Sequence, residues 1–426
     1  MEKYNSYKDS GIQWLGQIPS HWEVKHLRNF LTMFSEKGFG DAQLLSVTRE
    51  KGVILRDRDD KEENHNYVPD DLSGYKHLMP GDFVINKMKS WQGSYGVSNY
   101  EGIVSPAYFT CKLRGVDPQF FSRAIRSKAY IGFFMQYSKG IRVDQWDVDP
   151  SSMKDIPFIL PPFEEQKKIV PYLDAATAKI DEAIAQQQCM IDLLNERKQI
   201  IIGHAVSKGL HNDVLLKESG FDWIGLIPSH WKVIKTSYVF THIGSGTTPS
   251  SGREDYYSED GFYFLQTGDL NDGYIKDTSR KITEKALKEV GLKVYPKGSL
   301  VIAMYGATIG KLGILDIDTT VNQACCVLPE TPSMDTRYAF YLFSAAKNDL
   351  IQQSKGGGQP NISQDTIRNE RIIVPPLKEQ IEIAKFIDSV CIPINTTISN
   401  ANLLIERLQE RKQIIINEVV TGKTKV

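Results

Sequence analysis

Residues 14–22 read WLGQIPSHW, and residues 223–231 read WIGLIPSHW, with seven of the nine positions identical. A second segment also occurs twice: LPPFEEQKKIVPYLD at 160–174 returns as VPPLKEQIEIAKFID at 374–388. The two copies of each segment lie 209 and 214 residues apart, far more than the roughly 20–50 residues of a solenoid repeat. The chain is therefore predicted to be two tandem copies of one domain-sized unit.

The two copies end alike and differ in between. ERKQII at 196–201 returns letter for letter at 410–415, whereas the middles keep only faint parallels, such as 78–97 with 294–314. Each of these parallel stretches has a Pro/Gly turn, an apolar strand and a polar loop that contains glycine. Constant ends around divergent centres predict a fixed frame that carries two different recognition surfaces.

The bulk composition is that of a globular protein. The chain has 426 residues, 41% hydrophobic and 24% charged, with a net charge of −1, so more than one domain is expected. No apolar run approaches the roughly 18 residues of a membrane span, and the N-terminal stretch lacks the apolar core of a signal peptide. The five cysteines are odd in number and form no C-x-x-C, which favours reduced thiols in a cytoplasmic protein.

The closing segment of each copy has the spacing of a long amphipathic helix. Apolar residues recur at alternating steps of three and four across 169–201 and again across 383–415. Such a narrow stripe needs a partner, and the alternatives are packing on the helix's own domain or pairing with the other copy. The sequence favours an antiparallel coiled coil between the two helices. Pro171 and Pro393 lie inside them and predict a kink or break in each.

A search for catalytic motifs finds none of the Walker, H-E-x-x-H or G-x-S-x-G type. The Pro-Pro-Phe after Leu160 resembles the Asn-Pro-Pro-Phe of amino-methyltransferases, but Leu160 and Val374 stand where an Asn or Asp would hold the amine. GSGTTP at 244–249 is Gly-rich, yet no acidic residue is placed to bind a ribose. His21 and His230 lie beside Trp, so we interpret them as packing or capping groups rather than ligands. No metal site is expected.

Charge indicates a nucleic-acid partner. Residues 76–142 contain ten Lys/Arg against three Asp/Glu, and residues 276–311 contain eight against three, while 57–71 is acidic. Lys and Arg neutralise phosphates, and amides read base edges, so these stretches predict DNA contact rather than a merely solvated face. The polar loops after each apolar strand supply the candidate DNA-binding residues, which are Lys87, Lys89, Trp91, Gln92, Lys139, Arg142, Tyr305, Thr308, Lys311, Gln323, Lys355, Gln359 and Asn361.

Together these motifs resemble the specificity subunit of type I restriction–modification systems. The resemblance rests on W-x-G-x-IPSHW at 14–22 and 223–231, on PP-x-x-EQ in both copies and on the two ERKQII closures. It covers essentially the whole chain. It implies two α/β target-recognition domains, each gripping half of a split DNA sequence, joined by two long helices that pair antiparallel and fix the gap between the half-sites.

The resemblance also implies a division of labour. The recognition domains would be residues 1–158 and 209–372, and the long helices 159–208 and 373–426. Two methyltransferase subunits and two restriction (translocase) subunits would dock on the frame. Catalysis, S-adenosylmethionine, ATP and Mg²⁺ would belong to these partners, with no cofactor in this chain. Two alternatives stay open: a DNA methyltransferase or nuclease in its own right, and a coiled-coil scaffold that binds no DNA.

Overall fold

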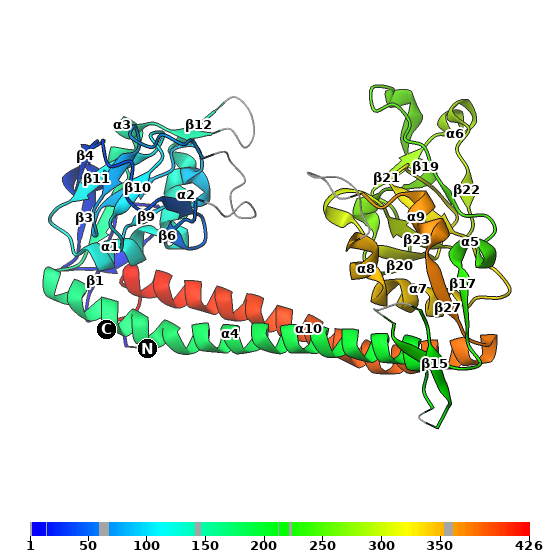
Figure 1. The fold of residues 1–426 in the computed structure, drawn as a ribbon. Helices are drawn as coiled ribbons and strands as arrows, with labels where there is room; N and C mark the ends of the chain where they lie inside the picture. Colours follow the sequence, from blue (N-terminus) through cyan, green and yellow to red (C-terminus); the bar gives the residue numbers. More distant parts are fainter. Residues whose placement is uncertain are drawn as a thin grey trace. The chain divides into compact units, whose positions relative to one another are not determined.

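The structure is a computed structural model that describes residues 2–13, 15–58, 68–140, 146–211, 213–220, 224–352 and 361–426. Trp14 and Trp223, which open the duplicated motif, lie outside the described residues. The chain forms two compact units. The first contains residues 1–188 and 402–426, and the second contains residues 189–401. Both units take in part of the green helix α4 and part of the orange-to-red helix α10 (Figure 1).

The first unit is built on a four-stranded antiparallel sheet. Its order is β4 (Leu31–Phe34), β11 (Phe109–Leu113), β8 (Phe83–Ile85) and β9 (Tyr95–Val97). Antiparallel pairs surround it: β1 (Tyr7–Asp9) with β2 (Gln17–Pro19), β3 (Glu23–His26) with β14 (Pro157–Leu160), β5 (Leu45–Thr48) with β6 (Gly52–Leu55), β7 (Lys76–Leu78) with β10 (Gly102–Val104), and β12 (Ser138–Lys139) with β13 (Asp147–Val148). Its short helices are α1 (Pro118–Ile125), α2 (Lys128–Gln136) and α3 (Pro150–Lys154).

The second unit repeats this sheet and extends it. The order is β18 (Gly244–Ser245), β26 (Cys325–Leu328), β23 (Leu300–Ala303), β24 (Leu312–Leu315) and β20 (Gly273–Ile275), which joins in parallel. A second sheet runs β21 (Arg280–Ile282), β19 (Tyr257–Leu265), β25 (Thr319–Val321) and β22 (Val294–Tyr295). The pairs are β15 (Leu216–Glu218) with β16 (Leu226–Pro228) and β17 (Lys232–Lys235) with β27 (Arg371–Val374). The helices are α5 (Thr236–Val239), α6 (Glu284–Val290), α7 (Thr336–Ala345), α8 (Lys347–Gln352) and α9 (Gln364–Asn369).

The long helices are α4 (Phe163–Lys208) and α10 (Leu377–Val420), and each contributes to the cores of both units. In the first unit, Ile169 and Leu173 of α4 and Val419 of α10 are buried with the sheet's aromatic residues. In the second unit, Val206 of α4 and Ile383 of α10 are buried in the same way. Since a fully buried aliphatic side chain is worth about 1.5–3 kcal/mol, the helix ends are firmly fixed to their sheets.

The predicted antiparallel coiled coil is confirmed. In the first unit, Lys412 Nζ lies 2.6 Å from Asp181 Oδ1, and in the second unit Lys198 Nζ donates to Asn395 Oδ1 at 3.0 Å. Advancing along α4 from 181 to 198 thus moves the contact back along α10 from 412 to 395. The predicted fold class, with two tandem α/β units on paired long helices, is therefore correct.

The sequence predicts a kink or a break at each proline, and the structure contradicts the break. Helix α4 is continuous through Pro171, and α10 is continuous through Pro393. Each proline removes one backbone donor, which would weaken an isolated helix. Here Ile169 and Leu173 on either side of Pro171 are buried in the core of the first unit. Tertiary packing therefore holds the helical path where local propensity would interrupt it.

The duplicated motifs meet at the start of each long helix. Glu165 in the first turn of α4 accepts a hydrogen bond from Trp22 Nε1 at 2.9 Å and lies 2.5 Å from His21 Nε2. In the second unit, Glu379 accepts from Trp231 Nε1 at 2.8 Å and lies 2.8 Å from the His230 ring. Both indoles are fully buried, so each needs an acceptor for its N–H. The interpretation of both histidines as packing groups agrees with this geometry.

The glutamine that follows each glutamate forms hydrogen bonds that join the long helix to a short helix. Gln166 donates from Nε2 to Pro161 O at 2.8 Å and accepts from the Asp117 backbone N–H at 2.9 Å. Gln380 accepts from the Asp335 N–H at 2.8 Å in the same way. Asp117 and Asp335 are the N-caps of α1 and α7, so the PP-x-x-EQ motif joins the long helix to the first residue of a short one. These contacts give the repeated PP-x-x-EQ motif the same structural role in both units.

Candidate nucleic-acid interface

Three loops of the first unit emerge at the same end of its sheet. The register pairs Phe34 with Thr110, Phe109 with Ile85, and Ile85 with Tyr95. Strands β4 and β8 therefore end where β11 and β9 begin, because neighbouring antiparallel strands run in opposite directions. The loops at this end cover 35–40, 86–94 and 105–108, and we call them the first loop face.

The second unit has the same arrangement. Ser245 pairs with Cys326, and Ala303 pairs with Cys325, so β18 and β23 end where β26 begins. The corresponding loops cover 246–253, 304–311 and 322–324, and we call them the second loop face. Loops that a rigid sheet positions are the usual carriers of binding residues.

The structure brings most of the described candidates of the first unit together. Lys87, Lys89, Trp91 and Gln92 lie on the loop after β8, where Ser90–Gln92 forms a short 3-10 helix, η2. The strand β13 packs against this loop, with the Val148 N–H donating to Lys87 O at 3.2 Å. The ring centroids of Trp91 and Trp146 are 5.3 Å apart.

Lysines at this face differ in how far their charge is available. Lys87 Nζ lies 3.2 Å from Asp147 Oδ2, so its charge is partly compensated. Lys89 and Lys139 are exposed. Lys139 lies opposite Asp147 in the strand register of β12 and β13. Two cations and an aromatic pair thus lie on neighbouring loops, an arrangement suited to phosphate and base contact. Arg142 lies outside the described residues.

The candidates of the second unit also converge. Tyr305 is 37% exposed and forms an isolated β-bridge with Asn361. Thr308 Oγ1 donates to Tyr305 O at 3.3 Å, and the Lys311 N–H donates to Thr308 O at 2.9 Å. Gln323 lies exposed on the neighbouring loop before β26. The predicted residues Lys355 and Gln359 lie outside the described residues.

Sequence reasoning missed two polar residues, Lys76 on β7 and Thr248 in the second loop face. Lys76 Nζ donates to Tyr108 O at 2.5 Å, and burial, with Lys37 nearby, lowers the pKa of Lys76. Thr248, in the Gly-rich loop after β18, donates from its hydroxyl to Gln323 Oε1. These contacts join residues far apart in the chain. Only the strand register brings these residues together, and the sequence has no periodic signal that predicts the register.

The count of basic residues overstated the charge that is available for DNA. Many of these residues are engaged inside the protein, among them Arg126, whose guanidinium donates to three backbone carbonyls, the closest at 2.7 Å. Lys112 lies 2.8 Å from Asp82 Oδ2, and Lys297 lies 2.6 Å from Asp316 Oδ1. The net charge of a stretch therefore includes basic side chains that bind groups within the protein and are not available to a partner.

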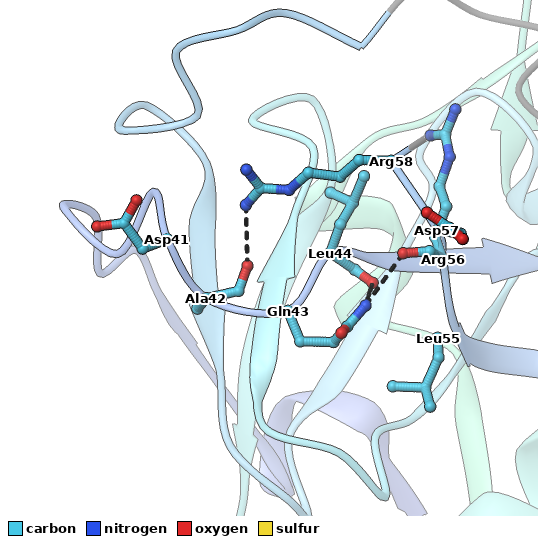
Figure 2. A pocket seen from close by; sticks show the side chains of 8 residues that line it. All are labelled: Asp41, Ala42, Gln43, Leu44, Leu55, Arg56, Asp57 and Arg58. Carbon is cyan, nitrogen blue, oxygen red and sulfur yellow. Dashed lines mark hydrogen bonds between the residues drawn. The ribbon is translucent and has the colours of Figure 1, made fainter. Parts of the chain in front are cut away.

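A hollow of about 660 Å³ lies beside the open end of the β5–β6 hairpin, lined by residues 41–44 and 55–58 (Figure 2). Arg58 Nη2 donates to Gly40 O at 2.7 Å, and Gln43 Nε2 donates to Leu44 O and Arg56 O at 3.0 Å. These polar groups hold neighbouring backbone. We assign the hollow a structural role.

Cysteine and acidic side chains are the groups that could bind a metal ion or supply a reactive thiol. Across the described ranges, no group of three or more His, Cys, Asp or Glu could hold a metal ion. The cysteines are free, and burial raises the pKa of Cys111 to about 12, far from the range of a reactive thiol. Within the same ranges, no helix combines the length and apolarity required to cross a bilayer.

Comparison with known proteins finds chains of one kind that are similar to this one. Residues 228–407 match the model of the type I restriction modification DNA specificity domain. The chain is 25% identical to the type I restriction enzyme MjaVIII specificity subunit of Methanocaldococcus jannaschii, over 96% of this chain and 94% of that one. It is 19% identical to the EcoKI specificity subunit of Escherichia coli K12, over 96% and 90%.

A solved structure shares the fold of the whole chain. It comes from work on complex assembly and conformational transition of the type I restriction–modification system. The TM-score is 0.66 at 16% identity, and the match covers 95% of this chain and 98% of the other. The arrangement of two sheet units on paired helices is thus an established fold.

Proposed function

The chain belongs to the family of type I restriction–modification specificity subunits, and we propose that each of its two units binds one half of a split DNA target. It is the non-catalytic subunit that recognises the DNA target and assembles with other subunits of the complex. One observation carries the proposal. The same sheet end occurs twice, with lysines and Trp91 on the first loop face and tyrosine, threonine and amides on the second.

Two unlike surfaces on one duplicated frame suit an asymmetric target. Hydrogen bonds to base edges distinguish sequences, whereas contacts to phosphates fix position. The exposed Lys89 and Lys139 would neutralise phosphates at the first half-site, and the amides of Gln323 and Asn361 would reach base edges at the second. The other described DNA-contacting candidates are Lys87, Trp91, Gln92, Tyr305, Thr308 and Lys311. Arg142, Lys355 and Gln359 stay in the proposal on sequence grounds.

The proposal extends to the assembly. The same frame occurs twice, each copy held by the contact of a buried indole with Glu165 or Glu379, and two equivalent frames suit two identical partners, which would be methyltransferase subunits. Two restriction (translocase) subunits would complete the complex, and S-adenosylmethionine, ATP and Mg²⁺ would bind to the partners. We place the complex in the cytoplasm, where the DNA lies. The recognition domains would be 1–158 and 209–372, with the helices at 159–208 and 373–426.

Exchange of one unit's centre tests whether the units bind independently. Residues 31–155 would be replaced by the corresponding segment of another specificity subunit, and the chain would be assembled with its methyltransferase partner. Sequencing of modified sites should show one altered half-site and one unchanged half-site. The matched control replaces 240–370 instead and should alter the other half. A hybrid that changes both half-sites at once would contradict the proposal, and this chain without its partner should modify no DNA.

A single lysine tests whether the second loop face contacts phosphates. Lys311→Ala should weaken binding to all DNA sequences alike and reduce the slope of log K against log salt by about 0.9. Lys288→Ala is the matched control, because Lys288 is paired with Glu284 at 2.6 Å on α6. An unchanged salt slope for Lys311→Ala would remove this residue from the interface. No detectable DNA binding by the wild-type complex would instead favour a scaffold that does not bind DNA.

A further inference from the structure

The turn before the second strand of each sheet has the same construction in both units. In the first unit, the Ala107 N–H donates to Ser105 Oγ at 3.4 Å, and in the second the Ala324 N–H donates to Asn322 Oδ1 at 3.1 Å. The next residue along donates its N–H to the carbonyl of Ser105 or Asn322 in both turns. Ser and Asn perform the same local capping task. The two turns therefore present their tips in equivalent positions.

The tip of this turn carries a different side chain in each unit. It is Pro106 in the first unit and Gln323 in the second, and both are exposed. An exposed residue on a fixed turn can be replaced with little loss of stability. The turn still holds the new side chain at the same position. Such a position can change what a unit recognises without changing how the unit folds.

In the second unit the tip contacts a neighbouring loop, and the corresponding position of that loop also differs between the units. Phe34 pairs with Thr110 in the first unit, and Gly244 pairs with Val327 in the second. Four residues beyond these strand positions lie Gly38 in the first unit and Thr248 in the second. Thr248 donates its hydroxyl to Gln323 Oε1. Gly38 and Pro106 have no side-chain groups for such a bond, so the second unit differs from the first at both members of the pair.

The loop that carries Thr248 is held closely in place. A Cβ on Gly246 would lie 1.5 Å from Val321 O, so only glycine permits this approach. Two tyrosine hydroxyls bind the backbone on either side of Thr248: Tyr295 donates to Ser245 O at 3.0 Å, and Tyr257 donates to Pro249 O at 2.8 Å. A hydroxyl on a loop fixed at several points can orient the amide that it contacts.

We propose that Gln323 reads an adenine in the half-site bound by the second unit, and that Thr248 is its positioning residue. A glutamine amide forms two hydrogen bonds with adenine in the major groove, accepting from N6 and donating to N7. The Gln323 oxygen has two lone pairs, one for the Thr248 hydroxyl and one for the adenine N6–H. Its NH₂ group then faces N7. The neighbouring Asn322 oxygen is already used by the turn. This inference rests on the proposed function.

The test measures sequence discrimination by the complex of the full chain with its methyltransferase subunit. A library randomised in the second half-site is bound, and relative affinities are obtained by sequencing. Gln323→Ala should lower discrimination at one A·T base pair by roughly 5- to 150-fold and leave the other positions unchanged. Thr248→Val should lower discrimination at the same base pair by a smaller factor. Thr248→Ser, which keeps the hydroxyl, should restore it.

Gln199→Ala is the matched control, because Gln199 is an exposed glutamine on α4 in the same unit. It should leave the whole profile unchanged. Loss of discrimination at a G·C pair, equal weakening for every sequence, or an unaltered profile for Gln323→Ala would each overturn the adenine assignment. A wild-type complex with no sequence preference would instead overturn the proposed function, so the two failures are distinguishable. Thermal melting shows whether each variant is folded before its profile is measured.

Discussion

The two units agree at the start of their long helices and differ at their loop faces. In both units a first-turn glutamate, Glu165 or Glu379, accepts a buried indole N–H, and the next glutamine binds the N-cap of a short helix. At the loop faces, a proline tip in one unit stands where a glutamine stands in the other. Duplication has therefore preserved buried hydrogen bonds and changed exposed side chains.

Energetics explains this division. Loss of one partner leaves a buried donor unsatisfied and costs about 1–3 kcal/mol, whereas exposed substitutions are usually within about 0.5 kcal/mol of neutral. The frame can thus tolerate little change, and the loop faces can tolerate much. Equivalent substitutions in the two frames should therefore cost similar free energies of unfolding.

The largest expected effect comes from the buried indoles. Trp22→Ala and Trp231→Ala should each lower the free energy of unfolding of their own unit by about 3–5 kcal/mol, because both side chains are fully buried. Hydrogen-exchange mass spectrometry of peptides from each unit would measure the loss separately. Similar losses in the two units would support an equivalent frame. A loss in one unit alone would show that the repeated motif stabilises the two units unequally.

The glutamates should show a smaller effect and a difference between units. Glu165 also accepts from Tyr4 Oη at 3.2 Å, so it serves three donors where Glu379 serves two. Glu165→Gln and Glu379→Gln should each cost about 1–2 kcal/mol, with the greater loss in the first unit. Denaturant unfolding followed by hydrogen exchange would measure both. Tyr4→Phe is the control, since it should reduce the difference between the two variants.

The frame was predictable from the sequence because its signals are local and repeated. The three-and-four spacing predicted the paired helices, and Ile169, Ile180, Ile383 and Ile394 of the predicted stripe are buried as expected. The prolines misled because helix propensity is local, whereas burial of the neighbouring side chains is tertiary. Composition predicted basic stretches that contact DNA, but several of their lysines form ion pairs within the fold.

The candidate site was only partly predictable. Lys87 to Gln92 were found because they follow an apolar strand directly. The contact of Thr248 with Gln323 was not found, since it joins two loops through the pairing of β18 with β26. Strand register decides which loops meet, and a single sequence carries no direct signal for register. The roles of all the candidate residues in DNA binding stay predictions.

A further difference lies where the long helices contact the short ones. Asp388 on α10 binds Arg337, with Nη1 3.1 Å from Oδ2, and also accepts from the Tyr341 hydroxyl. Asp174, at the corresponding place on α4, binds Arg123 and no second side chain among the residues that the structure describes. Asp388→Asn should therefore cost about 1 kcal/mol and Asp174→Asn about 0.5 kcal/mol, because both pairs are partly exposed. Equal losses in thermal unfolding would contradict the ranking.

The smallest effect concerns the two contacts between the long helices. Lys412 forms an ion pair with Asp181 in the first unit, whereas Lys198 meets the neutral Asn395 in the second. Asp181 and Asn395 follow Phe163 and Leu377, the first residues of their helices, at the same distance along the chain. The two lysines also correspond, since each is the third residue of ERKQII. The duplicated contact is thus ionic in one copy and neutral in the other.

Asn395→Asp should make the second contact ionic and add about 0.2–1 kcal/mol to the stability of the second unit at low salt. Asp181→Asn is the reciprocal control and should remove a similar amount from the first unit. Since exposed ion pairs are screened, both changes should nearly vanish at 1 M salt, where the Debye length is about 3 Å. Hydrogen exchange of peptides from 189–211 and 402–426 would resolve the two effects. A gain that persists at 1 M salt would show that Asn395→Asp acts through packing or helix propensity, and the two contacts would then not be electrostatic equivalents.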